Sequence, residues 1–256
     1  MIPARAALLA VMLMVSTLAP AQQSDPYQTW ARVLTRFVNE RGEVDFRALS
    51  RERGDLDAFL DYVARFSPRS TPESFPGREA KLAYYINSYN ALAMFNVIDS
   101  DFPQNLNSWR KIRFFGLKRF PVGGERMSLY ALENDVIRPL GDERVHFALN
   151  CMVVSCPRLP RVAFTPEKLD RQLEDEARRF FADTRNLQVQ SDRKLVRVSA
   201  ILKFYTEDFL AKSPTLIAYI NLYAPARIPG NFTIEFMDYD WTVNDQVRGV
   251  AEHESR

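Results

Sequence analysis

The chain has 256 residues, 46% of them hydrophobic and 12% aromatic, which is enough for one large domain with a substantial core. Its 34 lysines and arginines nearly balance its 32 aspartates and glutamates, so the net charge does not favour nucleic acid or an anionic membrane as a partner. No repeat, low-complexity block or long linker divides the sequence, which indicates a single domain.

The first 21 residues have the pattern of a secretory signal peptide. Arg5 precedes an apolar run over residues 6–19, and residues 19–21 read Ala-Pro-Ala, a small-residue cleavage site. The apolar run is shorter than the roughly 20 residues that span a bilayer, and no later segment is as long. We therefore expect cleavage before Gln22, no transmembrane segment in the mature chain, and a periplasmic or secreted location.

Apolar residues recur at helical spacing in the first part of the chain. This spacing predicts amphipathic helices over residues 30–38, 56–66 and 78–98, and the aromatic content of the last helix favours a central position. The proline-rich stretch 67–77 predicts a loop. After Asp101 short strands are expected, with a tight turn at Gly123-Gly124, where two glycines allow the positive φ that a hairpin needs.

The second half predicts helices between short strands. Ser128 is expected to cap a helix that runs to Pro139, residues 145–149 predict a buried strand, and the Thr165 hydroxyl is expected to cap the helix that begins at Pro166. The remaining elements are a hairpin over residues 187–198, helices over 200–210 and 215–223, and a strand over 233–236. We predict an α+β fold, a helix-rich single domain with a small, mostly antiparallel sheet over residues 22–245 and a polar tail at 246–256.

Thiol chemistry, if the chain performs any, is confined to residues 146–156, which hold both cysteines and one of the two histidines. A cysteine nucleophile needs a neighbouring base, and His146 is the expected partner because His253 lies close to the charged C-terminus. A chain reversal at Asn150-Cys151 brings residues 145 and 156 opposite each other, which places Cys156 near His146.

The same cysteines fit other states. In an oxidising compartment a disulfide between Cys151 and Cys156 is expected if the turn brings their Cα atoms to about 4.4–6.8 Å. A reversible redox pair is a further alternative. The spacing of His146 and the two cysteines lacks the short Cys-x2–4-Cys pattern of a zinc site. The sequence therefore leaves the disulfide and the free nucleophile open, and indicates no metal and no cofactor.

Residues 109–120 alternate basic and aromatic side chains. Such interleaving is typical of surfaces that bind polyanions. A solvated hairpin whose aromatic side chains enter the core explains the pattern as well, and export from the cell speaks against nucleic acid. An anionic polymer of the cell envelope is the remaining partner of this class.

Four runs of the sequence resemble the DUF547 family, a domain of unknown function. The runs are residues 83–92, 120–124, 144–157 and 239–244, and their order and spacing resemble an exported bacterial member over roughly residues 28–245. Arg158 stands where family members often have a second proline. The resemblance places the polar positions of the family on Asn87, Asn90, Glu133, His146, Cys151 and Cys156, together with Arg138, Asp240 and Trp241.

Each of these residues has a catalytic and a structural interpretation. Asn87 and Asn90 share one helical face, where their amides donate to an oxyanion or tie a buried loop. Glu133 orients His146, or forms an ion pair with an arginine such as Arg138. Asp240 and Trp241 anchor the last strand by capping and packing.

Two functions follow from these roles. The first is a cysteine/histidine-dependent hydrolase or acyl transferase that acts on amide or ester bonds in the cell envelope. The second is a non-catalytic binding module, stabilised by a disulfide, for a peptide, glycan or protein partner. Both imply an envelope ligand, small molecule, peptide or glycan, and neither implies nucleic acid.

Overall fold

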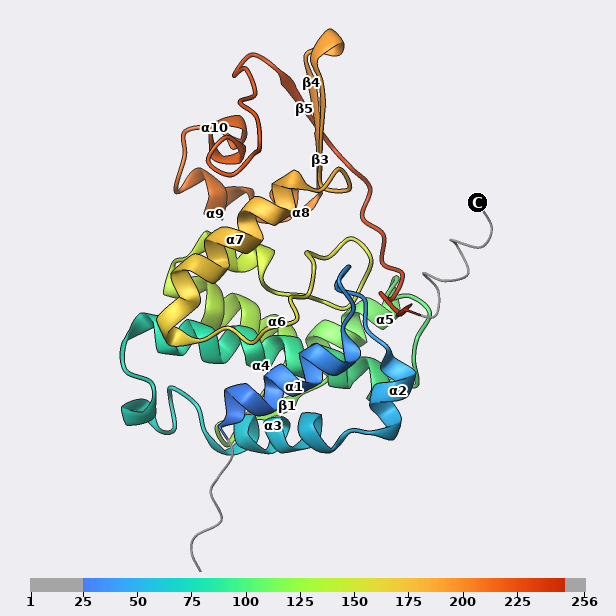
Figure 1. The fold of residues 1–256 in the computed structure, drawn as a ribbon, viewed down its shortest axis with the longest axis vertical. Coiled ribbons are helices and arrows are strands. Elements are labelled where there is room, and N and C mark those ends of the chain that lie inside the picture. The colour runs from blue at the N-terminus through green and yellow to red at the C-terminus, as the bar shows by residue number, and fades with distance from the viewer. Residues whose placement is uncertain (1–24, 247–256) are drawn as a thin grey trace, which may run out of the picture.

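The computed structural model describes residues 25–246 (Figure 1). The expected signal peptide, His253 and nearly all of the expected tail lie outside these residues. The first part of the described chain is helical: α1 (Pro26–Phe37), α2 (Phe46–Arg51), α3 (Gly54–Arg65) and α4 (Gly77–Asp99), with a short 3-10 turn at Pro72–Ser74. These bounds confirm the three helices expected from the apolar spacing.

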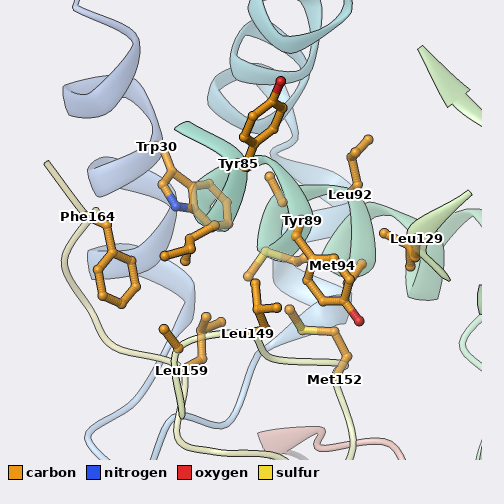
Figure 2. Packing of buried hydrophobic residues seen from close by; sticks show 14 of the residues in the cluster. Trp30, Tyr85, Tyr89, Leu92, Met94, Leu129, Leu149, Met152, Leu159 and Phe164 are labelled. Carbon is orange, nitrogen blue, oxygen red and sulfur yellow. The ribbon is translucent and has the colours of Figure 1, made fainter. Parts of the chain in front are cut away.

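Helix α4 is the centre of the larger hydrophobic core. Its residues are buried on nearly every face, which fits its aromatic and alanine-rich sequence. Figure 2 shows Tyr89 and Met94 of α4 beside Leu149 and Met152, which come from the cysteine-containing segment. That segment is therefore seated directly on the central helix.

Residues 109–117 are helical, so the expected strand there is wrong. Helix α5 (Trp109–Lys111) continues into a π-helical turn, Ile112–Leu117. Phe114 is buried while Ile112, Arg113 and Leu117 are exposed, a one-sided burial that suits a helix and breaks the alternation of a strand. The expected hairpin follows as β1 (Phe120–Val122) and β2 (Glu125–Met127), with positive φ at both turn glycines.

The next helical stretch begins where Ser128 predicts it. The Ser128 hydroxyl accepts a hydrogen bond from the backbone N–H of Ala131 at 3.1 Å. Helix α6 (Leu129–Ala131) then continues through the π-helical turn Leu132–Ile137 and the 3-10 turn Arg138–Leu140. This stretch carries Glu133 and Arg138 towards the candidate site.

Residues 145–149 are buried, but the expected strand is wrong, because Glu143–Phe147 forms a 3-10 turn. Val145 and Leu149 pack in the larger core, whereas Phe147 packs in a second cluster with residues of α7 and α10. An apolar run that is buried on both sides has no periodicity that separates strand from helix. The turn is thus the junction between the two cores.

The elements of the last part of the chain lie together at one end of the molecule (Figure 1), and they contribute every residue of the second cluster except Phe147. These elements are a 3-10 turn at Pro166–Lys168, α7 (Leu169–Ala182), β3 (Leu187–Gln190), a 3-10 turn at Ser191–Arg193, β4 (Leu195–Val198), α8 (Ile201–Phe204), α9 (Thr206–Leu210), α10 (Leu216–Ile220) and β5 (Thr233–Phe236). The Thr165 side chain makes no capping hydrogen bond, so that expectation is wrong: the Thr165 N–H donates to Gln172 instead.

Strand pairing agrees with the expected fold class, a helix-rich α+β structure with small sheets. Strands β1 and β2 pair antiparallel, as do β3 and β4, while β5 adds to β4 in parallel. Within residues 25–246, no helix has the length and apolar character needed to cross a bilayer.

Candidate functional site

Cys151 and Cys156 are joined by a disulfide, with their Cα atoms 6.1 Å apart. The chain reverses just after Cys151. There Met152 has a positive φ of 63° and its N–H donates to the Asn150 side chain at 2.7 Å. The reversal near Asn150 expected from the sequence is therefore present, and it brings the cysteines together. In this state neither sulfur is a thiolate.

His146 is held by a residue that the sequence did not indicate. Its Nε2 lies 2.7 Å from a carboxylate oxygen of Asp208, and its ring stacks on Tyr205 with the ring centres 3.7 Å apart. The side chain is only 1% exposed. Its Nδ1 is buried without a hydrogen-bond partner among the described residues. The imidazole is thus fixed at one nitrogen and unused at the other.

Arg138 completes this arrangement from the stretch that follows α6. Its guanidinium donates two hydrogen bonds to Asp208, at 2.8 and 2.9 Å, and a third to Asn134 at 2.7 Å. The hydrogen bond from His146, and then the one from Arg138, hold the pKa of the Asp208 carboxyl well below its usual range. Asp208 is therefore ionised at neutral pH.

Glu133 is buried next to this group and accepts hydrogen bonds from two phenols. Its carboxylate oxygens accept from Tyr89 at 3.1 Å and from Tyr205. Burial, and then the Glu133 charge, raise the pKa of the Tyr205 phenol above its ordinary value. Among the described residues Glu133 makes no hydrogen bond to His146 or Arg138, the two partners expected from the sequence. It fixes the ring on which His146 stacks.

Asn87 and Asn90 tie loops to α4. The Asn87 amide donates to the Phe164 carbonyl at 2.7 Å and accepts from the Phe164 N–H at 3.1 Å. In the same way Asn90 donates to Ala148 at 3.0 Å and accepts from Asn150 at 2.8 Å. Both side chains are buried and neither lines the cavity beside the disulfide. This is the loop-tying interpretation of the two residues.

We expect Asn90→Leu to lower the free energy of unfolding by about 2–4 kcal/mol, because it leaves a buried carbonyl and a buried N–H without partners. Urea unfolding at neutral pH measures the change. Asn107, which is exposed, provides the control: Asn107→Leu is expected to stay within about 0.5 kcal/mol of the wild type. Equal stability of the two variants would show that Asn90 does not hold the loop.

A cavity of about 560 Å³ lies beside the disulfide. Its lining combines aromatic rings with a few polar groups: Tyr89, Lys111, Ile112, Phe115, Gly116, Tyr130, Glu133, Asn134, Arg138, His146, Leu149, Cys151, Cys156, Pro157, Ile201, Phe204, Tyr205, Tyr239 and Trp241. Four of the six residues expected at a site therefore share one cavity, namely Glu133, His146, Cys151 and Cys156. Within residues 25–246, no group of three His, Cys, Asp or Glu side chains is placed to hold a metal ion.

Residues 239–241 contribute two aromatic side chains, Tyr239 and Trp241, to the lining of this cavity. The Tyr239 hydroxyl lies 3.5 Å from the Cys151 sulfur and 3.4 Å from the Cys156 sulfur. The rings of Tyr239 and Trp241 are 4.7 Å apart, and the Lys111 ammonium lies 4.3 Å from the centre of the Trp241 ring. The Asp240 carboxylate accepts a hydrogen bond from the Thr242 N–H, which is the local cap expected from the sequence. Trp241 lines the cavity and also packs against the larger hydrophobic core.

A comparison with known protein families matches the part of the chain that carries most of the cavity residues. Residues 72–181 match the family model of DUF547, described as a protein of unknown function. This part of the chain is similar to the DUF547 family. The matched DUF547 residues include α4, Glu133, His146 and both cysteines, whereas Asp208, Tyr239 and Trp241 come from the chain that follows them. No curated protein and no solved structure matches the chain.

Proposed function

We propose that this protein is an exported binding protein, and that its cavity takes a peptide or glycan of the cell envelope. One observation carries the proposal: an aromatic cavity of ligand size is walled by a disulfide, where thiol catalysis needs a free sulfur. Its volume of about 560 Å³ lies within the range of small-molecule sites, roughly 300–1,000 Å³. Binding is thus the function that the oxidised chain supports best.

The lining favours a ligand that offers both flat apolar faces and hydrogen-bonding groups. Tyr130, Phe204 and Trp241 offer rings from three separate segments. Arg138 and Asn134 supply polar atoms at fixed positions, because they are hydrogen-bonded to each other. A few fixed polar groups in an apolar cavity give a ligand its orientation. Sugar rings and peptide side chains both satisfy these requirements.

A hydrolase or acyl transferase is the second candidate, and the unpartnered Nδ1 of His146 favours it. An imidazole oriented by a carboxylate at one nitrogen and free at the other is the arrangement of a general base. This function requires a dithiol reductant, which would reduce the disulfide to two thiols while it is itself oxidised to a disulfide. In the oxidised chain no sulfur is a hydrogen-bond partner of His146 Nδ1.

Binding is tested with soluble peptidoglycan fragments, separated into glycans and stem peptides, by titration calorimetry without reductant. We expect saturable binding of one class. Gly116 lines the cavity and a Cβ there meets nothing within 4 Å, so Gly116→Trp attaches an indole to the lining with free space at the Cβ. We expect this variant to bind at least about tenfold more weakly.

The matched control is Gly230→Trp, since Gly230 also has free space around a Cβ but lies outside the lining. Its affinity is expected to equal that of the wild type. The proposal is contradicted if neither fragment class gives a binding heat in the titration. It is also contradicted if Gly116→Trp and Gly230→Trp bind equally well. Mass spectrometry of the same fragments with dithiol-reduced protein tests the hydrolase: cleavage products that disappear in His146→Ala would support it.

A further inference from the structure

The helical segment over residues 109–117 presents an apolar and basic face to solvent. Trp109, Ile112 and Leu117 are 62%, 52% and 55% exposed. Arg110, Lys111 and Arg113 are exposed between them. We call these six residues the docking face. Large apolar side chains that remain exposed this close together mark a surface that has a partner.

The fold holds this face outward. The carbonyl of Phe114 accepts a hydrogen bond from the buried Asn96 side chain at 3.0 Å, and the Phe114 ring packs at 4.9 Å from that of Phe115. The two phenylalanines thus anchor the segment to α4 and to the cavity wall. With the inward positions taken by these rings, the other apolar side chains of the segment point to water.

The segment that carries the docking face contains basic residues and no acidic ones. No aspartate or glutamate occurs between residues 102 and 124, a stretch that contains five basic residues. Lys118 forms an ion pair with Asp99, but within residues 25–246 neither Arg110 nor Arg113 does so with any acid. The net charge of the whole chain is near zero and does not reveal this local excess of positive charge. The excess attracts an anionic surface that lies within a Debye length, about 8–10 Å.

We propose that the docking face binds the surface of a bilayer that contains anionic phospholipid. Charge complementarity selects this partner: arginine and lysine side chains meet lipid phosphates, while a tryptophan and aliphatic side chains enter the boundary between headgroups and acyl chains. The same short helix carries both kinds of side chain, as interfacial helices do. The attachment is peripheral.

Docking sets the cavity next to the bilayer. Lys111, Ile112, Phe115 and Gly116 line the cavity, so the segment that contacts lipid is also one of its walls. Lys111 belongs to both surfaces through its contact with Trp241. The protein therefore meets its ligand at the membrane surface. This inference does not depend on whether the cavity binds its ligand or transforms it.

The test is co-sedimentation of the full mature protein with vesicles of phosphatidylglycerol and phosphatidylethanolamine, against vesicles of phosphatidylcholine alone. We expect binding to the anionic vesicles that weakens with added salt. Arg110→Glu/Arg113→Glu is expected to bind at least about tenfold more weakly, since each basic residue near such a surface favours binding. Trp109→Ser/Ile112→Ser/Leu117→Ser is expected to lose binding at all salt concentrations.

Two controls make the same kinds of change away from the docking face, the first with the same change in charge and the second with a loss of exposed apolar side chains. Arg193→Glu/Arg227→Glu and Val162→Ser/Val189→Ser alter exposed residues elsewhere and are expected to bind like the wild type. Brominated phosphatidylglycerol provides a readout on the unaltered chain: it is expected to quench wild-type tryptophan fluorescence. Trp109→Phe is expected to reduce this quenching, because Trp30 is buried and only the half-buried Trp241 remains near the docking face. Absence of vesicle binding, equal losses in the controls, or binding to an anionic polysaccharide but not to vesicles overturns the proposal.

Discussion

Replacing Asp208 with alanine is expected to lower the free energy of unfolding by about 3 kcal/mol, the low end of the range for breaking a buried ion pair. The low end applies because the Asp208 side chain is 27% exposed. The variant leaves the Arg138 guanidinium without its carboxylate and His146 without its only hydrogen-bond partner among the described residues. Urea unfolding at neutral pH measures the loss.

Asp170 is the matched control, because it also pairs with an arginine, Arg144 at 2.8 Å, but its side chain is 86% exposed. Asp170→Ala is expected to cost less than about 1 kcal/mol, as is usual for exposed ion pairs. Equal losses in the two variants would mean that the contact of Asp208 with His146 and Arg138 adds nothing to an ordinary surface pair.

The stability that Asp208 contributes is expected to decrease as the pH falls. The pKa of Asp208 is lower in the folded chain than in the unfolded chain, so unfolding takes up a proton and acid favours it. Its stabilisation is complete above about pH 4, the ordinary pKa of aspartate, and is lost as the pH falls below that value towards the folded pKa. We therefore expect the stability difference between wild type and Asp208→Asn to shrink on acidification from about pH 7 to about pH 3.

Local patterns in the sequence predict those parts of the fold that depend on near neighbours. The apolar spacing around Trp30, the hydroxyl of Ser128 and the glycine pair at 123–124 each specify their element, because helix periodicity, capping and turn geometry act within a few residues. The disulfide between Cys151 and Cys156, one of the states that the sequence left open, also depends on near neighbours. Only five positions separate them, so a single turn decides whether they meet.

Contacts between distant segments escape such patterns. Asp208 meets His146 across 62 residues, and nothing near either residue indicates the other. Glu133 was expected to contact His146 or Arg138, and its tyrosine partners lie 44 and 72 residues away. The apolar run 145–149 was misassigned because it is buried by two cores at once, a property of the whole fold. The sequence therefore groups Glu133, His146 and the two cysteines, but it indicates neither Asp208 nor the hydrogen-bond partners of Glu133 and His146.

The oxidation state of the two cysteines decides between a binding protein and a thiol enzyme. A disulfide sulfur is inert to iodoacetamide, whereas a thiol next to an imidazole reacts readily near neutral pH. Labelling of these cysteines is therefore expected to be either absent or complete. A control sample, reduced and unfolded before treatment, is expected to take up two labels, because the chain has two cysteines.

The most direct measurement is the intact mass of the folded protein, purified without reductant and treated with iodoacetamide at about pH 7. We predict no adduct, and a mass two hydrogens below that of the dithiol. An adduct on Cys151 or Cys156, formed at a rate that falls in His146→Ala, would contradict the account and make the chain a thiol enzyme.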